Sequence, residues 1–168
     1  DQATLIRAFS HISRKHPGAR LCIFGDGPLQ QELRDLASSL EIADRVSVES
    51  AVADVLPLLH KAHLFAMSSL REGFPNVIAE AMAAGLPVVS TRVDGVGELV
   101  EENVTGLLVP SGAENGLAHA LDTLLSDPAR ARDMGLEGRM RVEREFTFER
   151  MAGAHAHLFE QLLNKGAT

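Results

Sequence analysis

The chain has 168 residues, of which 45% are hydrophobic and 23% charged, as is ordinary for one globular domain. Its formal net charge of −7 argues against a general nucleic-acid binder, because such a protein needs a basic face. No apolar run reaches the ~18 residues of a membrane span, no secretion signal opens the sequence, and the lone Cys22 excludes an internal disulfide. We therefore expect a cytoplasmic protein with Cys22 as a small core residue.

Strand and helix patterns alternate through the first two thirds of the chain. Leu5, Phe9 and Ile12 recur at helical spacing and predict a helix over residues 2–15. Short apolar runs, typical of strands buried on both faces, predict strands at 20–24, 45–48, 63–67, 87–91 and 106–109. The helices expected between them cover residues 29–40, 52–62, 75–84 and 96–101. Pro57 predicts a kink or a break within the second of these.

The last third reads as helix alone, at 113–126, 128–145 and 147–164. The whole pattern predicts an α/β fold: a doubly wound, Rossmann-like parallel sheet with helices on both faces and a helical C-terminal third. We treat residues 1–168 as a single domain.

Two glutamates, Glu72 and Glu80, flank the start of the helix predicted at 75–84. Pro75 suits the first position of a helix, and Gly85 suits the position just past its end. At 100° per residue, the side facing the sheet is expected to hold Val77, Ile78, Ala81 and Met82. The open side is expected to hold Asn76, Ala79, Glu80 and Ala83.

The helix start has the chemistry of an anion site. Its first amides, those of Asn76, Val77 and Ile78, lack partners within the helix, and the helix dipole favours an anion by about 0.3–1 kcal/mol. Gly73 lets a ligand approach the backbone closely. Phosphates here, with a carboxylate on each side to accept from hydroxyl groups, would match the layout of a nucleotide sugar. By spacing alone, both glutamates can equally be ordinary solvated side chains.

The run Glu72-Gly-Phe-Pro-Asn-Val-Ile-Ala-Glu80 resembles the E-x7-E region of retaining glycosyltransferases of the GT-B fold, the glycosyltransferases group 1 (GT4-type) family. Five further segments resemble family motifs in the same order. They are the GDGP turn at 24–28, the DRV strand entry at 44–46, the serine pair at 68–69, the segment at 94–100 and the TG-LLV strand at 105–109.

The resemblance implies a role for each matching residue. Glu72 is the implied catalytic-site carboxylate that contacts hydroxyls of the donor sugar, and Glu80 binds the ribose. The implied donor sugar and phosphate residues are Gly73, Phe74, Pro75, Asn76 and Val77. The implied base-binding residues are Gly25, Gly27, Pro28, Ser50 and Ala51, although plain turn geometry explains the first three equally well. Asp94-Gly95 is expected to shape a loop near the sugar.

The function implied by the resemblance is transfer of a hexose-type sugar, with retention, from a UDP- or GDP-type donor to a glycan or lipid-linked acceptor. It implies no cofactor, and no histidine spacing suggests a metal site. This chain would be the C-terminal lobe. We expect the acceptor lobe to precede Asp1, which is not an initiator Met, and the isolated chain to be inactive. The full-length enzyme can associate peripherally with a membrane.

Other readings stay open. A nicotinamide-binding Rossmann domain needs a third glycine where Gln30 stands. A GT-B epimerase or phosphorylase shares this lobe, and a non-catalytic nucleotide-binding or interaction module would keep the fold alone. The sequence also departs from the family at Val48-Glu49-Ser50, where a glycine is common, and at Pro75-Asn76.

A long amphipathic pattern ends the chain. Its apolar positions include Phe148, Met151, Leu158, Phe159, Leu162 and Leu163. In the family this final helix commonly crosses to the N-terminal lobe. Here we expect it to pack on its own domain, to swap into a neighbour, or to leave an exposed patch that promotes self-association.

Overall fold

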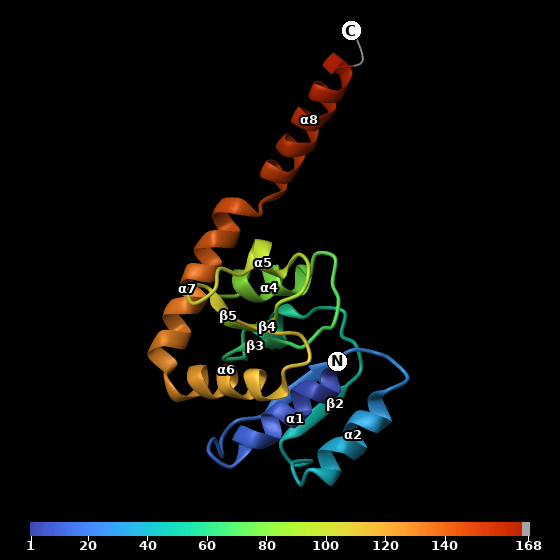
Figure 1. Cartoon of the computed structure of the whole chain (residues 1–168), viewed down its shortest axis with the longest axis vertical. Helices are drawn as coiled ribbons and strands as arrows, with labels where there is room; N and C mark the ends of the chain where they lie inside the picture. The colour runs from blue at the N-terminus through green and yellow to red at the C-terminus, as the bar shows by residue number, and fades with distance from the viewer. Residues whose placement is uncertain (166–168) are drawn as a thin grey trace.

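The computed structural model describes residues 1–165, and its strands and helices alternate as predicted until the last third (Figure 1). In chain order the elements are α1 (Gln2–Ser13), β1 (Leu21–Phe24), α2 (Gln30–Ser39), β2 (Val46–Glu49), α3 (Leu56–Leu59), β3 (Phe65–Met67), α4 (Asn76–Ala83), β4 (Val88–Thr91), α5 (Val96–Leu99), β5 (Gly106–Val109), α6 (Glu114–Ser126), α7 (Pro128–Glu145) and α8 (Phe148–Lys165).

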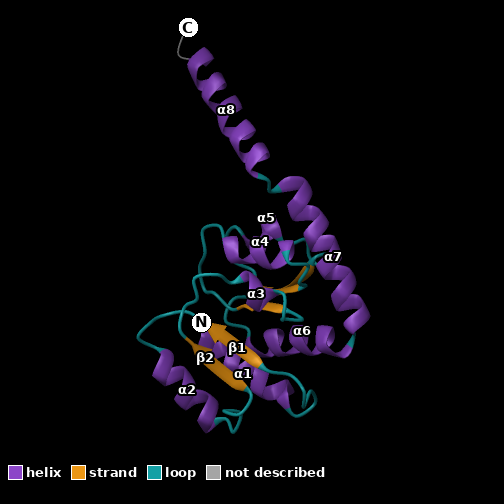
Figure 2. Ribbon diagram, turned by 180° about the vertical axis from the view of Figure 1, so that it is seen from behind, coloured by secondary structure: helices purple, strands orange, loops and turns teal. Residues whose placement is uncertain are grey.

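All five strands of the described residues pair in parallel, as the alternating pattern predicted. Their hydrogen bonds divide them into two groups, β1-β2 and β3-β4-β5 (Figure 2). The first pair runs in register from Leu21 opposite Val46, and β4 lies between its two neighbours with Val88 opposite Phe65 and Gly106. Paired parallel strands of this kind need crossover connections, which contain α2 between β1 and β2, α4 between β3 and β4, and α5 between β4 and β5.

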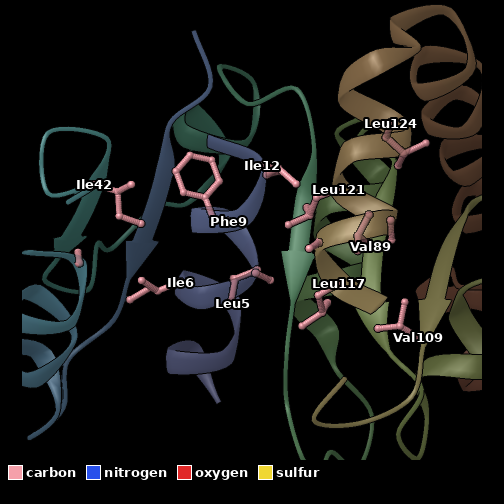
Figure 3. Packing of buried hydrophobic residues seen from close by; sticks show 14 of the residues in the cluster. Leu5, Ile6, Phe9, Ile12, Ile42, Val89, Val109, Leu117, Leu121 and Leu124 are labelled. Carbon is pink, nitrogen blue, oxygen red and sulfur yellow. The ribbon is translucent and has the colours of Figure 1, made fainter. Parts of the chain in front are cut away.

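The three-stranded sheet carries helices on both faces. Val89 packs into the cluster built by α1 and α6, whereas its neighbour Val88 packs into the cluster built by α4 and α5. Alternate residues of a strand point to opposite faces, so β4 is buried on both sides. Figure 3 shows Leu5 and Ile12 of α1 beside Leu121 of α6. The α/β architecture with helices on both faces is confirmed.

The β1-β2 pair differs from the expectation. Only alternate residues of β1 are half-buried, and Cys22 is exposed, so its predicted place in the core is wrong. Leu21 and Ile23 pack against the α1–α6 cluster, but Phe24 is 40% exposed. Within residues 1–165 the helices therefore cover one face of this pair.

Helix α3 is also shorter than predicted. It spans Leu56–Leu59, with Pro57 in its first turn rather than at a kink inside a helix over 52–62. Proline is tolerated in a first turn because the amide that it lacks would have no partner there. The preceding residues instead form a loop in which Asp54 Oδ1 accepts from the Leu56 amide at 3.0 Å.

Helix α4 starts one residue later than predicted, with Pro75 as its N-cap. Gly85 follows its end with φ +79°, and the Leu86 amide donates to the Ala81 carbonyl at 3.0 Å, which is how a left-handed glycine closes a helix. Ile78, Ala81 and Met82 are buried as expected. Val77 was placed on the sheet side but is 47% exposed, because that position lies at the edge of the buried face.

The last third is helical, as predicted. Helix α7 lies beside α4, where Gly135 is so close to the α4–β4 turn that an added Cβ would lie 2.1 Å from the Gly85 oxygen. Helix α8 extends away from the body (Figure 1). Its apolar side chains are exposed, with Phe148 at 82% and Phe159 at 61%. Packing of α8 on its own domain, the first expectation, is therefore wrong for its described side chains.

Candidate functional site

The loop that carries Glu72 follows the carboxyl end of β3 and is fixed to two neighbouring strands. Ser69 Oγ donates to Glu72 Oε1 at 2.6 Å. The Ser69 carbonyl in turn accepts from Thr91 Oγ1, at the end of β4, also at 2.6 Å. Thr91 is fully buried, so the donor side of this bond is shielded from water. The Glu72 carboxylate is therefore held at the ends of adjacent parallel strands, where open α/β sheets bind ligands.

A second segment lies against the same loop. Gly95, which precedes α5, has φ +74°, and a Cβ added there would lie 2.1 Å from the Gly73 carbonyl oxygen. Only glycine combines this backbone conformation with such a close approach. The structure therefore brings the predicted Asp94-Gly95 loop into direct contact with the predicted donor loop.

The start of α4 presents unpaired amides. Among the described residues, the amides of Asn76 and Val77 have no hydrogen-bond acceptor, whereas the Ile78 amide donates to the Pro75 carbonyl at 2.9 Å. The sequence expectation of three unpaired amides is thus wrong for Ile78. Gly73, Asn76 and Val77 are exposed, and Phe74 is exposed by 45%. Pro75 is buried and anchors the helix start to the body.

Glu80 lies one turn further along α4. Its side chain is exposed, beside the small residues Ala79 and Ala83. It makes no ion pair with any residue in the described part of the chain. Glu72 is half-buried. The two carboxylates thus flank the unpaired amides along the chain, one in the loop before them and one on the helix after them.

The predicted base-binding residues come from two segments that the structure joins. The Gly25 amide donates to the Glu49 carbonyl at 3.1 Å. The Ala51 amide donates to Asp26 Oδ1 at 3.2 Å, which ties the turn after β1 to the segment after β2. The residues of both segments are exposed. The role of Asp26 was not predicted, although an aspartate in a Gly-rich turn commonly caps a nearby amide.

Two hollows in the described part of the chain lie away from the predicted sites. A hollow of about 550 Å³ lies between the α5–β5 loop and α7, and another of about 340 Å³ lies between α1 and α2. Neither hollow contains a residue of the predicted donor or base sites.

Within residues 1–165 no three His, Cys, Asp or Glu side chains gather as metal ligands. No helix in this part of the chain has both the length and the apolar character to span a bilayer.

Comparisons with known proteins identify the family and the fold of the chain. The family described as Glycosyl transferases group 1 matches residues 1–141. A GDP-mannose-dependent alpha-(1-6)-phosphatidylinositol monomannoside mannosyltransferase from Mycobacterium tuberculosis is 38% identical over 160 residues, which are 90% of this chain and 42% of the relative. The HepE protein of Anabaena, solved in complex with UDP, has a TM-score of 0.88 and 27% identity, over 96% of this chain and 45% of that one.

The C-terminal domain of a group 1 family protein, LpcC from Francisella tularensis, matches with a TM-score of 0.80 over 88% of this chain and 80% of that one. At 22% identity this likeness shows the fold alone. The chain spans about 42% of the length of the curated relatives that it matches first. The chain belongs to the glycosyl transferases group 1 family and has the fold of the C-terminal lobe of its GT-B enzymes.

Proposed function

We propose that this chain binds the nucleoside-diphosphate sugar of a retaining hexosyltransferase, in the site built by Glu72, the start of α4 and Glu80. One observation carries the proposal: two unpaired amides at the start of α4 follow Glu72, in the loop after β3, and precede Glu80 on the helix. The amides suit phosphate oxygens. The carboxylates suit the hydroxyl groups of the two sugars that flank a diphosphate.

Each group has a distinct task. Glu72, oriented by Ser69, accepts hydrogen bonds from the transferred sugar. Glu80 accepts from the ribose hydroxyls, and the amides of Asn76 and Val77 stabilise the charge that grows on the leaving diphosphate. Fixed donors that face a developing charge lower a reaction barrier without reorganising. The joined segments at Gly25–Pro28 and Ser50–Ala51 receive the base.

The relatives support a nucleotide-sugar ligand and leave the base open. The mycobacterial relative is GDP-mannose-dependent by name, and HepE was solved with UDP. The departures at residues 48–50 fall in the base segment, so we propose a UDP- or GDP-type donor without choosing between them.

We propose that transfer to the glycan or lipid-linked acceptor belongs to the full-length enzyme, whose relatives are more than twice as long as this chain. The isolated chain is then expected to bind the donor without turning it over. Turnover of a nucleotide sugar by this chain and an acceptor alone would refute that expectation.

The proposal is tested by calorimetric titration of the chain with UDP, GDP and ADP. One diphosphate is expected to bind. Glu80→Ala should weaken its affinity by ~10–100-fold, since hydrogen bonds to a charged group are worth about 1.5–3 kcal/mol. Glu160→Ala, on exposed α8, is the matched control and should leave the affinity unchanged. If none of the three diphosphates gives a heat of binding, or if Glu80→Ala and Glu160→Ala bind with equal affinity, the result contradicts the proposal and favours a non-catalytic module.

A further inference from the structure

The ring of Phe74, next to Gly73 in the donor loop, is held from a distant part of the chain. Its centroid lies 6.1 Å from that of Phe146, at the end of α7, with the two rings inclined by 38°. This distance and tilt are those of a favourable aromatic pair. Phe146 is half-buried and packs against the cluster built by α4 and α5. The exposed Phe74 ring therefore rests on a partner that is itself fixed to the body.

Arg141 fixes Phe146 in turn. Its guanidinium carbon lies 5.8 Å from the centre of the Phe146 ring, within cation–π range. The same guanidinium donates through Nε to the Leu99 carbonyl and through Nη2 to the Glu98 carbonyl, both at 3.0 Å. Its Nη1 lies 3.2 Å from Glu145 Oε2. These bonds in several directions hold the planar Arg141 guanidinium in one orientation, and its contact restrains the position of the Phe146 ring.

Two of the contacts that hold the donor loop lead to the same helix, α5. Gly95, before the start of α5, lies against the Gly73 carbonyl, and the carbonyls at the end of α5 hold Arg141. Helix α7 runs beside α4 and α5 (Figure 1). The loop thus has a backbone contact with one end of α5 and, through Phe74, Phe146 and Arg141, a side-chain connection to the other end.

We infer that Phe146 and Arg141 are positioning residues of the donor site: they hold the Phe74 ring and so fix the backbone between Glu72 and Pro75. The inference rests on the proposed function for its ligand, a nucleoside-diphosphate sugar. Neither residue touches that ligand. Their effect is to keep the loop ordered before the donor arrives, so that binding loses less conformational freedom.

The test compares Phe146→Leu, which keeps apolar volume but removes the ring, with Phe146→Tyr, which keeps the ring. Hydrogen exchange over residues 69–77 is measured without ligand, and affinity for UDP and GDP is measured by calorimetry. Phe146→Leu should raise exchange in the loop and weaken affinity, each about two- to tenfold, and Phe146→Tyr should restore both. Arg141→Lys, which keeps the charge without the flat guanidinium, should behave like Phe146→Leu.

Phe148→Leu, two residues further on and 82% exposed, is the matched control and should change neither quantity. If Phe146 acts through Phe74, adding Phe146→Leu to Phe74→Leu should cause no further loss. Unchanged loop exchange or unchanged affinity in Phe146→Leu overturns the inference, as does a fully additive double variant. Raised loop exchange in a chain that binds no diphosphate contradicts the proposed function and leaves the loop contact standing.

Discussion

Asp122 on α6 joins the two helices that build the larger hydrophobic cluster. Its carboxylate lies 2.8 Å from Lys15 Nζ and 2.7 Å from His16 Nε2, both near the end of α1. The hydrogen bond from Lys15, followed by that from His16, lowers the pKa of Asp122 from 3.8 to about 2. The Asp122 carboxyl group therefore ionises more easily in the folded state than in the unfolded chain.

A pH dependence follows from that lowered pKa. A carboxylate that ionises more easily in the folded state stabilises the protein above its unfolded pKa, and this contribution is lost as pH falls toward the folded value. We expect the gap in unfolding free energy between wild type and Asp122→Asn to shrink from about pH 4 to about pH 2. Urea unfolding at several pH values measures it. Asp133→Asn, at an exposed position of α7, is the control, and a gap independent of pH would contradict the expectation.

At the scale of elements, the contact of α7 with the end of α4 depends on a glycine. A Cβ at Gly135 would lie 2.1 Å from the Gly85 oxygen, but one at Gly138, a turn further on, would lie 3.5 Å from Met82 Cγ. Both glycines are buried in α7. The first position admits no side chain because the obstacle is backbone, whereas the second offers ordinary contact distance to a flexible side chain.

The two glycines therefore predict opposite effects of one substitution. Gly135→Ala should destabilise the fold by about 1–3 kcal/mol, as overpacking does. Gly138→Ala should be neutral or stabilising by up to about 1 kcal/mol, because alanine favours a helix over glycine. Chemical denaturation of both variants checks this. Equal loss of stability in the two would show that α7 and α4 are not in the close contact described.

Elements with a clear apolar pattern could be predicted from the sequence. Helix α1 lies where its apolar period places it, β4 and β5 lie where short apolar runs place them, and Gly85 ends α4 as expected. The failures have tertiary causes. Cys22 is exposed because the described helices cover one face of β1-β2, which no local pattern reveals.

The candidate site divides in the same way. Glu72, Glu80 and the start of α4 lie within nine residues of one another, so a motif finds them. Phe146 meets Phe74 across 72 residues of sequence, and no periodic pattern connects them. Asp26 likewise meets Ala51 only because β1 and β2 pair. Contacts of this kind need the folded chain.

At the scale of the whole molecule, α8 stands apart from the rest. It extends from the body (Figure 1). Its apolar side chains are exposed, among them Leu158 at 51% and Leu163 at 75%. Exposed apolar surface of this kind favours association with another apolar surface. Self-association of this chain through α8 stays a prediction.

The central claim is that nucleoside diphosphate binds at the carboxyl ends of the strands, between Glu72 and Glu80. An NMR titration of the ¹⁵N-labelled chain with UDP and with GDP tests it most directly, because each amide reports its own surroundings. We predict that the shifted amides gather at residues 73–80, with a second group at 25–27 and 50–51. Shifts confined elsewhere, such as the hollow lined by Asn103 and Arg130, or no shifts with either diphosphate, would contradict the claim.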